Sequence, residues 1–159
     1  MNFNIFPKET SSYKSEFDSD KLIEILKENT LNGSLSSTAN QTQKKFIGRV
    51  EKDNFKIISS SYRTSMFCVF EGKLSYQSNQ ILLVKKFHPT FRNLFLLWFL
   101  AMLSLLIFLP GNSKQIATII PFISFVFLLR FLLITLLYRK SEEEGMEKLI
   151  HTLKLTEIK

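Results

Sequence analysis

The sequence predicts a membrane α+β protein with an N-terminal helix, a four-stranded antiparallel meander, a two-helix transmembrane hairpin and a C-terminal amphipathic helix. Three patterns predict this fold class. Residues 93–138 are almost entirely apolar, residues 44–87 alternate between apolar and polar side chains, and residues 146–153 place apolar side chains at helical spacing. The chain then divides into a polar N-terminal segment with one short helix and a linker (1–43), a cytosolic antiparallel β module (44–92), the transmembrane hairpin (93–138) and a cytosolic amphipathic helix (139–159).

A short helix is expected near the N-terminus. Leu22, Ile25 and Leu26 share one face of a helix of about three turns. Ser19 can cap the first N–H groups, and Asn32-Gly33 is a typical stop signal. We expect the apolar face of this helix to cover one face of the sheet that follows.

Residues 44–87 are expected to form β structure. The segments before them differ: residues 1–17 are polar with scattered aromatic side chains, which predicts loose order, and residues 34–43 are typical of a linker. Short runs with period-two alternation, separated by turn residues, indicate antiparallel strands. Four such runs are expected, at Lys45–Glu51, Phe55–Tyr62, Met66–Tyr76 and Gln80–Phe87.

Two membrane-spanning helices are expected, at about 93–110 and 115–138. About 20 apolar residues suffice to cross a bilayer core of about 30 Å. Pro110-Gly111 ends the first run, so a short turn makes the two helices antiparallel. Basic residues flank the outer ends of the hairpin, whereas the turn carries only Lys114, and the positive-inside rule therefore places both termini in the cytoplasm.

Basic residues near the membrane ends are candidates for binding lipid headgroups. Antiparallel pairing about the turn places Arg130 beside Asn93, near the cytoplasmic surface rather than the bilayer centre. The Arg130 side chain can then extend to lipid phosphates, and the alternative is a charge that serves an ion or a partner protein. The expected headgroup collar comprises Lys85, Lys86, Arg92, Arg130, Arg139 and Lys140.

An amphipathic helix is expected after the hairpin. Met146, Leu149, Ile150 and Leu153 recur at the i, i+3, i+4, i+7 spacing of one helix face. Three roles are open for this face: it can dock on the sheet, lie on the membrane or bind a partner.

The sequence shows no catalytic, metal-binding or nucleotide-binding motif, and we expect neither enzymatic activity nor a cofactor. Cys68 is the only cysteine, which excludes an internal disulfide. It shares a strand face with Met66 and Phe70, which indicates a buried structural thiol rather than a nucleophile paired with His88. The serines at 59–61 have no base near them in the sequence.

The formal net charge is +7, and a basic chain can indicate nucleic acid. Cytoplasmic flanks of membrane segments also collect Lys and Arg, and no basic block here is interleaved with aromatic side chains. The expected partners are therefore the lipid bilayer and an unspecified protein, without nucleic acid. The oligomeric state does not follow from the sequence.

Two short segments echo each other: Phe46-Ile-Gly48-Arg-Val50 and Phe70-Glu-Gly72-Lys-Leu74. A glycine inside a strand often marks a bulge or a close backbone approach, and we expect two bulged strands here rather than a repeat. Followed by an apolar hairpin, these segments resemble a group of small uncharacterised bacterial membrane proteins in which a β-rich cytosolic module precedes two helices. The resemblance covers roughly residues 44–138. It implies a location in the bacterial inner (plasma) membrane but no activity and no site.

Two classes of function are consistent with these patterns. The first is a membrane-tethered cytosolic binding or scaffold module, of which an immunity-type protein that neutralises a membrane-acting toxin is a special case. The second is a small accessory subunit of a transporter or channel complex, with Arg130 acting inside the bilayer. A soluble partner favours the first class and a multi-span partner favours the second.

Overall fold

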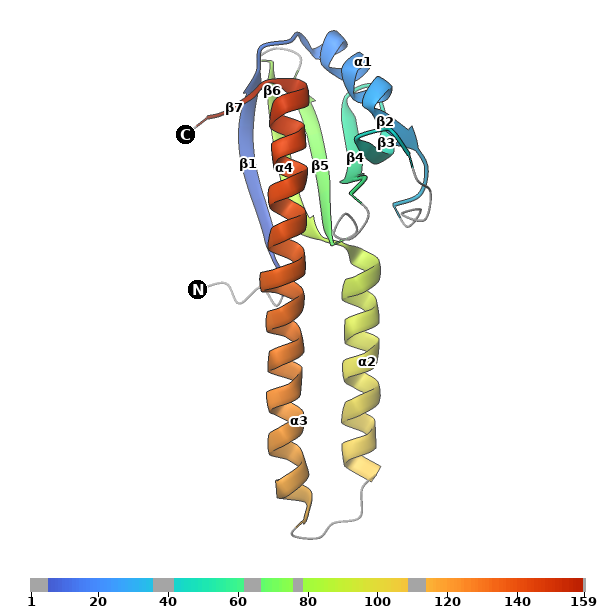
Figure 1. Ribbon diagram of the computed structural model, residues 1–159, viewed down its shortest axis with the longest axis vertical. Coiled ribbons are helices and arrows are strands. Elements are labelled where there is room, and N and C mark those ends of the chain that lie inside the picture. The colour runs from blue at the N-terminus through green and yellow to red at the C-terminus, as the bar shows by residue number, and fades with distance from the viewer. Residues whose placement is uncertain (1–5, 36–41, 62–66, 76–78, 109–113, 159) are drawn as a thin grey trace.

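The computed structural model describes residues 6–35, 42–61, 67–75, 79–108 and 114–158, with the side chains of 105–108 and 114–120 excepted. A sheet domain lies at one end, and two helices extend from it (Figure 1). The elements in chain order are β1 (Lys8–Ser15), α1 (Ser19–Asn29), β2 (Thr30–Asn32), β3 (Phe46–Val50), β4 (Asn54–Ser59), β5 (Cys68–Ser75), β6 (Gln80–Phe87), α2 (Pro89–Phe108), α3 (Lys114–Phe131), the π-helix η1 (Leu132–Tyr138), α4 (Arg139–Leu153) and β7 (Leu155–Glu157).

The strands form one mixed sheet in the order β2-β3-β4-β5-β6-β1-β7. Neighbours are antiparallel except β2 and β3, which are parallel. Strands β3, β4, β5 and β6 occupy the four predicted runs, whose outer residues Tyr62, Met66 and Tyr76 lie outside the described residues. The predicted four-stranded meander was nevertheless wrong, because β1, β2 and β7 extend this sheet to seven strands.

The strand β1 was hidden within a segment expected to be loosely ordered. Its sequence KETSSYKS has one large apolar side chain, Tyr13, so the alternation that marks a strand is weak. The tertiary fold supplies what the local sequence lacks, because β1 pairs along β6 from Lys8 to Lys14. Pairing with β6, rather than the β propensity of its own residues, therefore makes this segment a strand.

One face of the sheet is covered by α1 and α4, which cross it as a single layer of helices (Figure 1). The expected cover by the N-terminal helix is confirmed, since Leu22 and Leu26 of α1 are buried in the main core. The helix α4 adds Leu149 and Leu153, both fully buried. The strand side chains of this core include Tyr13, Phe46, Phe55, Ile57, Phe70, Ile81, Leu83 and Phe87.

The ends of α1 differ from the sequence prediction. Asp18, rather than Ser19, is the N-cap, and its side chain accepts a hydrogen bond from the Lys21 N–H at 3.2 Å. The helix ends at Asn29 instead of continuing to Asn32-Gly33, because β2 begins at once and pairs with β3.

The expected bulges at the two strand glycines are absent, because the pairing registers run through Gly48 and Gly72 without an extra residue. The other interpretation, a close approach, is observed instead. A Cβ at Gly48 would lie 2.2 Å from the Lys56 carbonyl oxygen, and the φ of Gly48 is +151°, which side chains rarely tolerate. A Cβ at Gly72 would lie 2.1 Å from the Phe55 ring. The ring of Phe55 therefore occupies the space that a side chain at position 72 would need.

The predicted two-helix transmembrane hairpin with a separate terminal helix was wrong. The apolar segment does not stop at Tyr138, because α3, η1 and α4 follow one another without a break. Among the described residues, one helix is long and apolar enough to cross a membrane by length and composition, Pro121–Leu153. The helix α2 runs beside α3 in the opposite direction (Figure 1), but its first turns belong to the domain core, where Phe95 is buried.

The predicted location, a multi-pass protein of the bacterial inner membrane with both termini cytoplasmic, was also wrong. Such a placement needs at least two spans, and the described part of the chain contains one candidate. The positive-inside argument for this location counted Arg139 and Lys140 as flanking charges, on the assumption that a membrane helix ends at Tyr138. Tyr138 is instead buried in the main core, and the basic residues Arg139 and Lys140 begin a helix that docks on the sheet.

Candidate functional site

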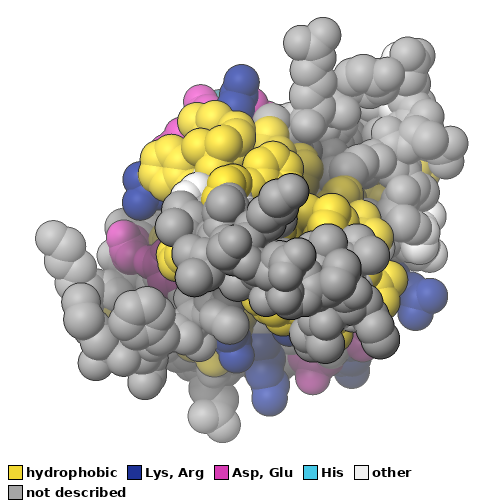
Figure 2. All heavy atoms as spheres, turned by 90° about the horizontal axis from the view of Figure 1, so that it is seen from below, with side chains coloured by type: hydrophobic (Ala, Val, Ile, Leu, Met, Phe, Trp, Pro, Cys, Tyr) yellow, Lys and Arg dark blue, Asp and Glu magenta, His cyan; other side chains and the backbone are white. Residues whose placement is uncertain are grey.

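An exposed apolar surface surrounds the parts of α2 and α3 that extend beyond the sheet. Viewed from below, hydrophobic side chains gather around these helices, with Lys and Arg side chains at the rim (Figure 2). Soluble proteins seldom expose large apolar patches without a partner or lipid. The most exposed large side chains are Leu94, Leu97, Leu100, Phe125, Phe127, Leu128, Phe131 and Leu136, each at least half exposed.

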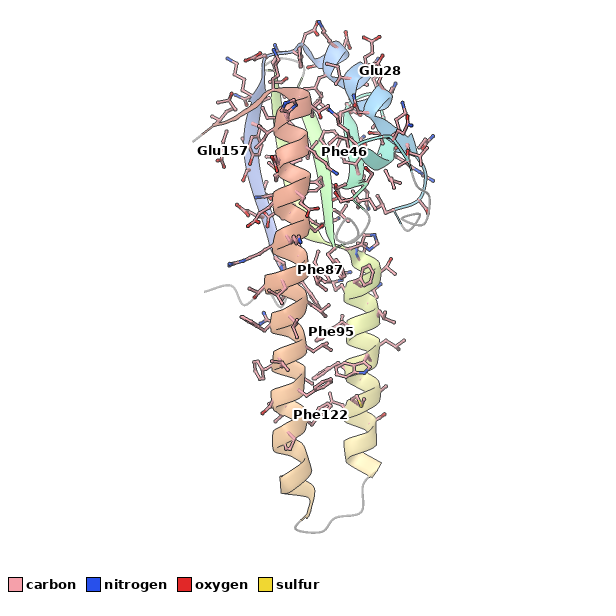
Figure 3. The ribbon with its side chains drawn as sticks, viewed as in Figure 1. Glu28, Phe46, Phe87, Phe95, Phe122 and Glu157 are labelled. Atoms are coloured by element: carbon pink, nitrogen blue, oxygen red, sulfur yellow. The ribbon has the colours of Figure 1, made fainter. Side chains whose placement is uncertain are left out.

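Aromatic contacts join α2 to the long helix and to the sheet. The rings of Trp98 and Phe125 lie 5.9 Å apart, and Phe95 contacts both Trp98 and Phe6. Phe87, Phe95 and Phe122 lie at successive levels from the sheet towards the far end of the helices (Figure 3). The apolar surface is therefore attached to the sheet domain by packed rings rather than by a loose linker.

The docking of α4 is fixed by close packing and by backbone contacts. A Cβ at Gly145 would lie 2.3 Å from the Phe70 ring, so only glycine lets the helix approach this closely. The Ser141 hydroxyl accepts a hydrogen bond from the Cys68 N–H at 3.1 Å. Of the three roles left open for the terminal helix, the structure shows docking on the sheet.

A buried ion cluster also ties α4 to the sheet. The Lys85 Nζ donates to Glu142 at 2.7 Å and to Glu9 at 3.0 Å, and the Lys85 side chain is 9% exposed. Burial disfavours the ammonium, but the bonds to the two carboxylates outweigh this cost and raise the pKa of Lys85. Lys85 therefore stays charged and holds β6, β1 and α4 together.

The six residues of the predicted headgroup collar lie in different surroundings. Lys85 is enclosed as described above, and Lys86 donates to Glu71 at 2.6 Å. Arg92, Arg139 and Lys140 are exposed near the junction of helices and sheet, and Arg130 is half-buried in α3. The structure therefore leaves Arg92, Arg139 and Lys140 open to solvent but places Lys85 inside the fold.

Cys68 is fully buried, as predicted for a structural thiol. Burial raises the pKa of Cys68 to about 12, so the thiolate form is scarce at neutral pH. His88 is also buried, and burial lowers its pKa. The His88 Nδ1 accepts a hydrogen bond from the Thr90 N–H at 3.2 Å, which fits a histidine that shapes the start of α2.

A lysine that the sequence did not connect with the serines at 59–61 lies beside them. The Lys148 Nζ is 2.9 Å from the Ser59 hydroxyl and 2.7 Å from the Ser61 hydroxyl. Serine with lysine is a known catalytic pair, and Ser59 is only 1% exposed whereas Ser61 is half-buried. The hydroxyls solvate the ammonium where α4 crosses β4.

The sheet face opposite α4 is basic, which the sequence analysis missed. Cross-strand partners share a face, and one row across the sheet runs Ser12–Leu82–Lys73, while another pairs Lys14 with Gln80. Leu82 is 47% exposed. A hollow of about 290 Å³ lies here, lined by Ser12, Lys73, Leu74, Ser75, Gln80 and Leu82.

The strand β1 contributes to this outer face through Lys8, Thr10, Ser12 and Lys14. Lys8 and Lys14 are six residues apart, so they share a face only if the segment is a strand, and that assignment was not made from the sequence. Within the described residues, no group of three or more His, Cys, Asp or Glu side chains could hold a metal ion.

Comparisons with protein-family models, with curated proteins and with solved structures find no match for this chain.

Proposed function

We propose that the chain is a membrane-anchored binding module, in which the apolar part of the long helix is embedded in lipid and the sheet domain projects from it. The observation that carries this proposal is the division of one uninterrupted helix into two halves. Its first half exposes Phe125, Phe127, Leu128 and Phe131. Its second half, α4, is docked on the sheet.

The dimensions support an anchor. The α-helical part, Lys114–Phe131, has 18 residues and is about 27 Å long at 1.5 Å per residue, which is close to a bilayer core of about 30 Å. A helix satisfies most of its backbone groups internally, as a lipid environment requires, and membrane helices tolerate an interior proline such as Pro121. The exposed apolar side chains of α2 beside it enlarge the surface available to lipid.

The module is held rigidly to its anchor. The helix passes from lipid to the sheet without a hinge loop, and the Lys85–Glu142 ion pair and the Gly145–Phe70 contact fix its docked half. A scaffold that presents a surface at a set orientation to the membrane needs such a connection. Arg92, Arg139 and Lys140 are exposed near the junction and would contact anionic headgroups.

Flotation with phosphatidylcholine vesicles tests the anchor. Phe127 and Leu128 lie near the middle of the exposed half, where each lysine costs about 2.5–3.5 kcal/mol to insert. The double substitution Phe127→Lys/Leu128→Lys should reduce the floated fraction by about tenfold or more. Ile150→Lys/Ile158→Lys is the matched control, because it adds the same charge at exposed apolar positions outside α3 and should float like wild type.

The headgroup contacts are tested in parallel with anionic vesicles. Arg139→Gln/Lys140→Gln should weaken binding to anionic vesicles by about 1 kcal/mol per residue and leave binding to neutral vesicles unchanged. A wild-type chain that stays monodisperse without detergent and fails to float would overturn the proposed anchor.

A further inference from the structure

We propose that the outer face of β1, β6 and β5 binds an acidic segment of a partner protein, with an apolar side chain of that segment seated beside Leu82. The inference rests on the proposed function, because it names the partner of the membrane-anchored module. The part of this face around Leu82 is open, because α1 and α4 cover the opposite side of the sheet (Figure 1). Farther across the sheet, Ile47, Ile58 and Val69 are buried against Leu31 and Leu35.

The charges on this face are strongly unbalanced. Strand alternation and cross-strand register place a single acidic side chain there, Glu71, among the described strand residues. Glu71 already pairs with Lys56 at 3.0 Å and Lys86 at 2.6 Å. These bonds outweigh the burial that would raise its pKa, and the pKa of Glu71 is lowered, so the carboxylate is fully engaged. The cations on this face are Lys8, Lys14, Arg49, Lys56, Lys73 and Lys86.

Two of these cations flank the hollow. Lys73 lies opposite Leu82, and Lys14 lies opposite Gln80 on the neighbouring strand. Both are exposed, and no ion pair within the described strands and helices involves either. An exposed leucine between two unpaired ammonium groups complements a ligand with an apolar side chain between carboxylates.

Lipid headgroups fit this face poorly. The strands β1, β5 and β6 run roughly parallel to the long helix (Figure 1). The outer face is therefore roughly perpendicular to the membrane plane when the helix is embedded. The hollow beside Leu82 lies at the end of β5 and β6 that is far from α2, since Gln80 begins β6 and Phe87 ends it just before α2. A bilayer that holds α3 therefore cannot cover it.

Nucleic acid also fits poorly. Sheets that bind single strands stack the bases on aromatic side chains. Within the described strands, the apolar side chains of the outer face are Leu82, Val84, Val69, Ile58 and Ile47, and none is aromatic. Val69, Ile58 and Ile47 are buried against Leu31 and Leu35, so Leu82 and Val84 are the two that remain accessible. A second copy of the chain is excluded as the occupant by charge, because two such faces would repel each other.

Fluorescence anisotropy with the full chain in a neutral detergent tests the inference. The probe is a labelled peptide of about twelve residues that alternates Glu with small residues around one central Leu. Versions with Gln or Lys in place of Glu are the charge controls. Only the acidic peptide should bind, and its affinity should fall about tenfold or more when the salt rises from ~50 to ~300 mM.

Surface variants locate the binding. Lys14→Glu/Lys73→Glu should lower the affinity for the acidic peptide by about tenfold or more, and Leu82→Ser should lower it by about fivefold. Lys21→Glu/Lys27→Glu changes the net charge equally on α1 and should leave the affinity within about twofold. Equal losses in both double variants, or no binding of the acidic peptide, would overturn the inference.

Two further arms separate this inference from its alternatives. Lys14→Glu/Lys73→Glu should float with vesicles like wild type, and Phe127→Lys/Leu128→Lys in detergent should bind the acidic peptide normally. Loss of flotation in the first variant would assign the face to lipid, and tighter binding of a single-stranded RNA of similar length would assign it to nucleic acid. Either result contradicts a protein ligand, whereas failure of wild-type flotation alone contradicts only the anchor.

Discussion

The Lys85 ammonium donates to the Glu142 carboxylate at 2.7 Å, across the interface where α4 docks on β6. Lys85 is the sixth residue of β6, and Glu142 lies three residues after Arg139, the first residue of α4. Lys85 was expected to contact lipid headgroups. Its contact with Glu142 instead helps to hold α4 on the sheet.

The first prediction concerns this pair. Lys85→Met should lower the free energy of unfolding by about 3 kcal/mol, because it leaves the carboxylates of Glu142 and Glu9 without their buried partner. Glu142→Gln should cost less, since Glu9 remains. Thermal unfolding in mild detergent, followed by circular dichroism, measures both. Glu143→Gln on the exposed side of α4 is the control, and an equal loss there would refute a specific role for the pair.

The second prediction concerns the Gly145–Phe70 contact. In an exposed helix, Gly→Ala gains up to about 1 kcal/mol, but here the new methyl group would meet the Phe70 ring at 2.3 Å. Gly145→Ala should therefore destabilise the fold by about 1–3 kcal/mol. Phe70→Leu creates room for the new methyl group. The double variant Phe70→Leu/Gly145→Ala should therefore lose less stability than the sum of the two single losses. Strict additivity of the two substitutions would contradict the contact.

The third prediction concerns the buried thiol. Cys68 should react with maleimide only on unfolding, so labelling of the native protein should be slower than that of the unfolded chain by about 100-fold or more. Rapid labelling without unfolding would show that the thiol is accessible.

The same thiol gives a pH dependence with a defined sign. Its pKa is about 12 in the folded chain and about 8.5 when unfolded, so above pH ~8.5 the unfolded state loses the proton first. The Cys68 contribution to stability should thus fall as pH rises from ~8.5 to ~12. Comparing the unfolding midpoints of wild type and Cys68→Ala across this pH range separates the Cys68 contribution from that of other titrating groups. Parallel pH profiles of the two proteins would refute the predicted contribution.

Several features were predictable because their causes are local. Period-two alternation located β3, β4, β5 and β6. Of the predicted apolar face of α4, Leu149 and Leu153 are buried, whereas Met146 is partly buried and Ile150 is 42% exposed. Gly48 and Gly72 indicated positions where no side chain fits, although the bulges expected there are absent from the pairing registers. Burial of Cys68 followed from its apolar neighbours on one strand face.

Other features depended on partners distant in the sequence. The strand β1 is too polar to be recognised alone, and it exists because β6 offers an unpaired edge. Lys85 could be assigned to a lipid collar only while Glu9 and Glu142 were unplaced, because a lysine next to an apolar segment gives no hint of its counter-ions. The contact between Lys148 and the serines of β4 likewise joins segments almost ninety residues apart.

The sequence by itself therefore determined where the chain is apolar, where it alternates and which faces seek burial, because these properties belong to consecutive residues. The tertiary structure decided that the apolar segment and the terminal helix are one helix, since helix continuity past Tyr138 depends on the docking of α4 against Phe70 and Lys85. The tertiary structure also decided which lysines form ion pairs and which remain exposed on the outer face of the sheet. Both outcomes follow from long-range contacts, whose free energies no local pattern encodes.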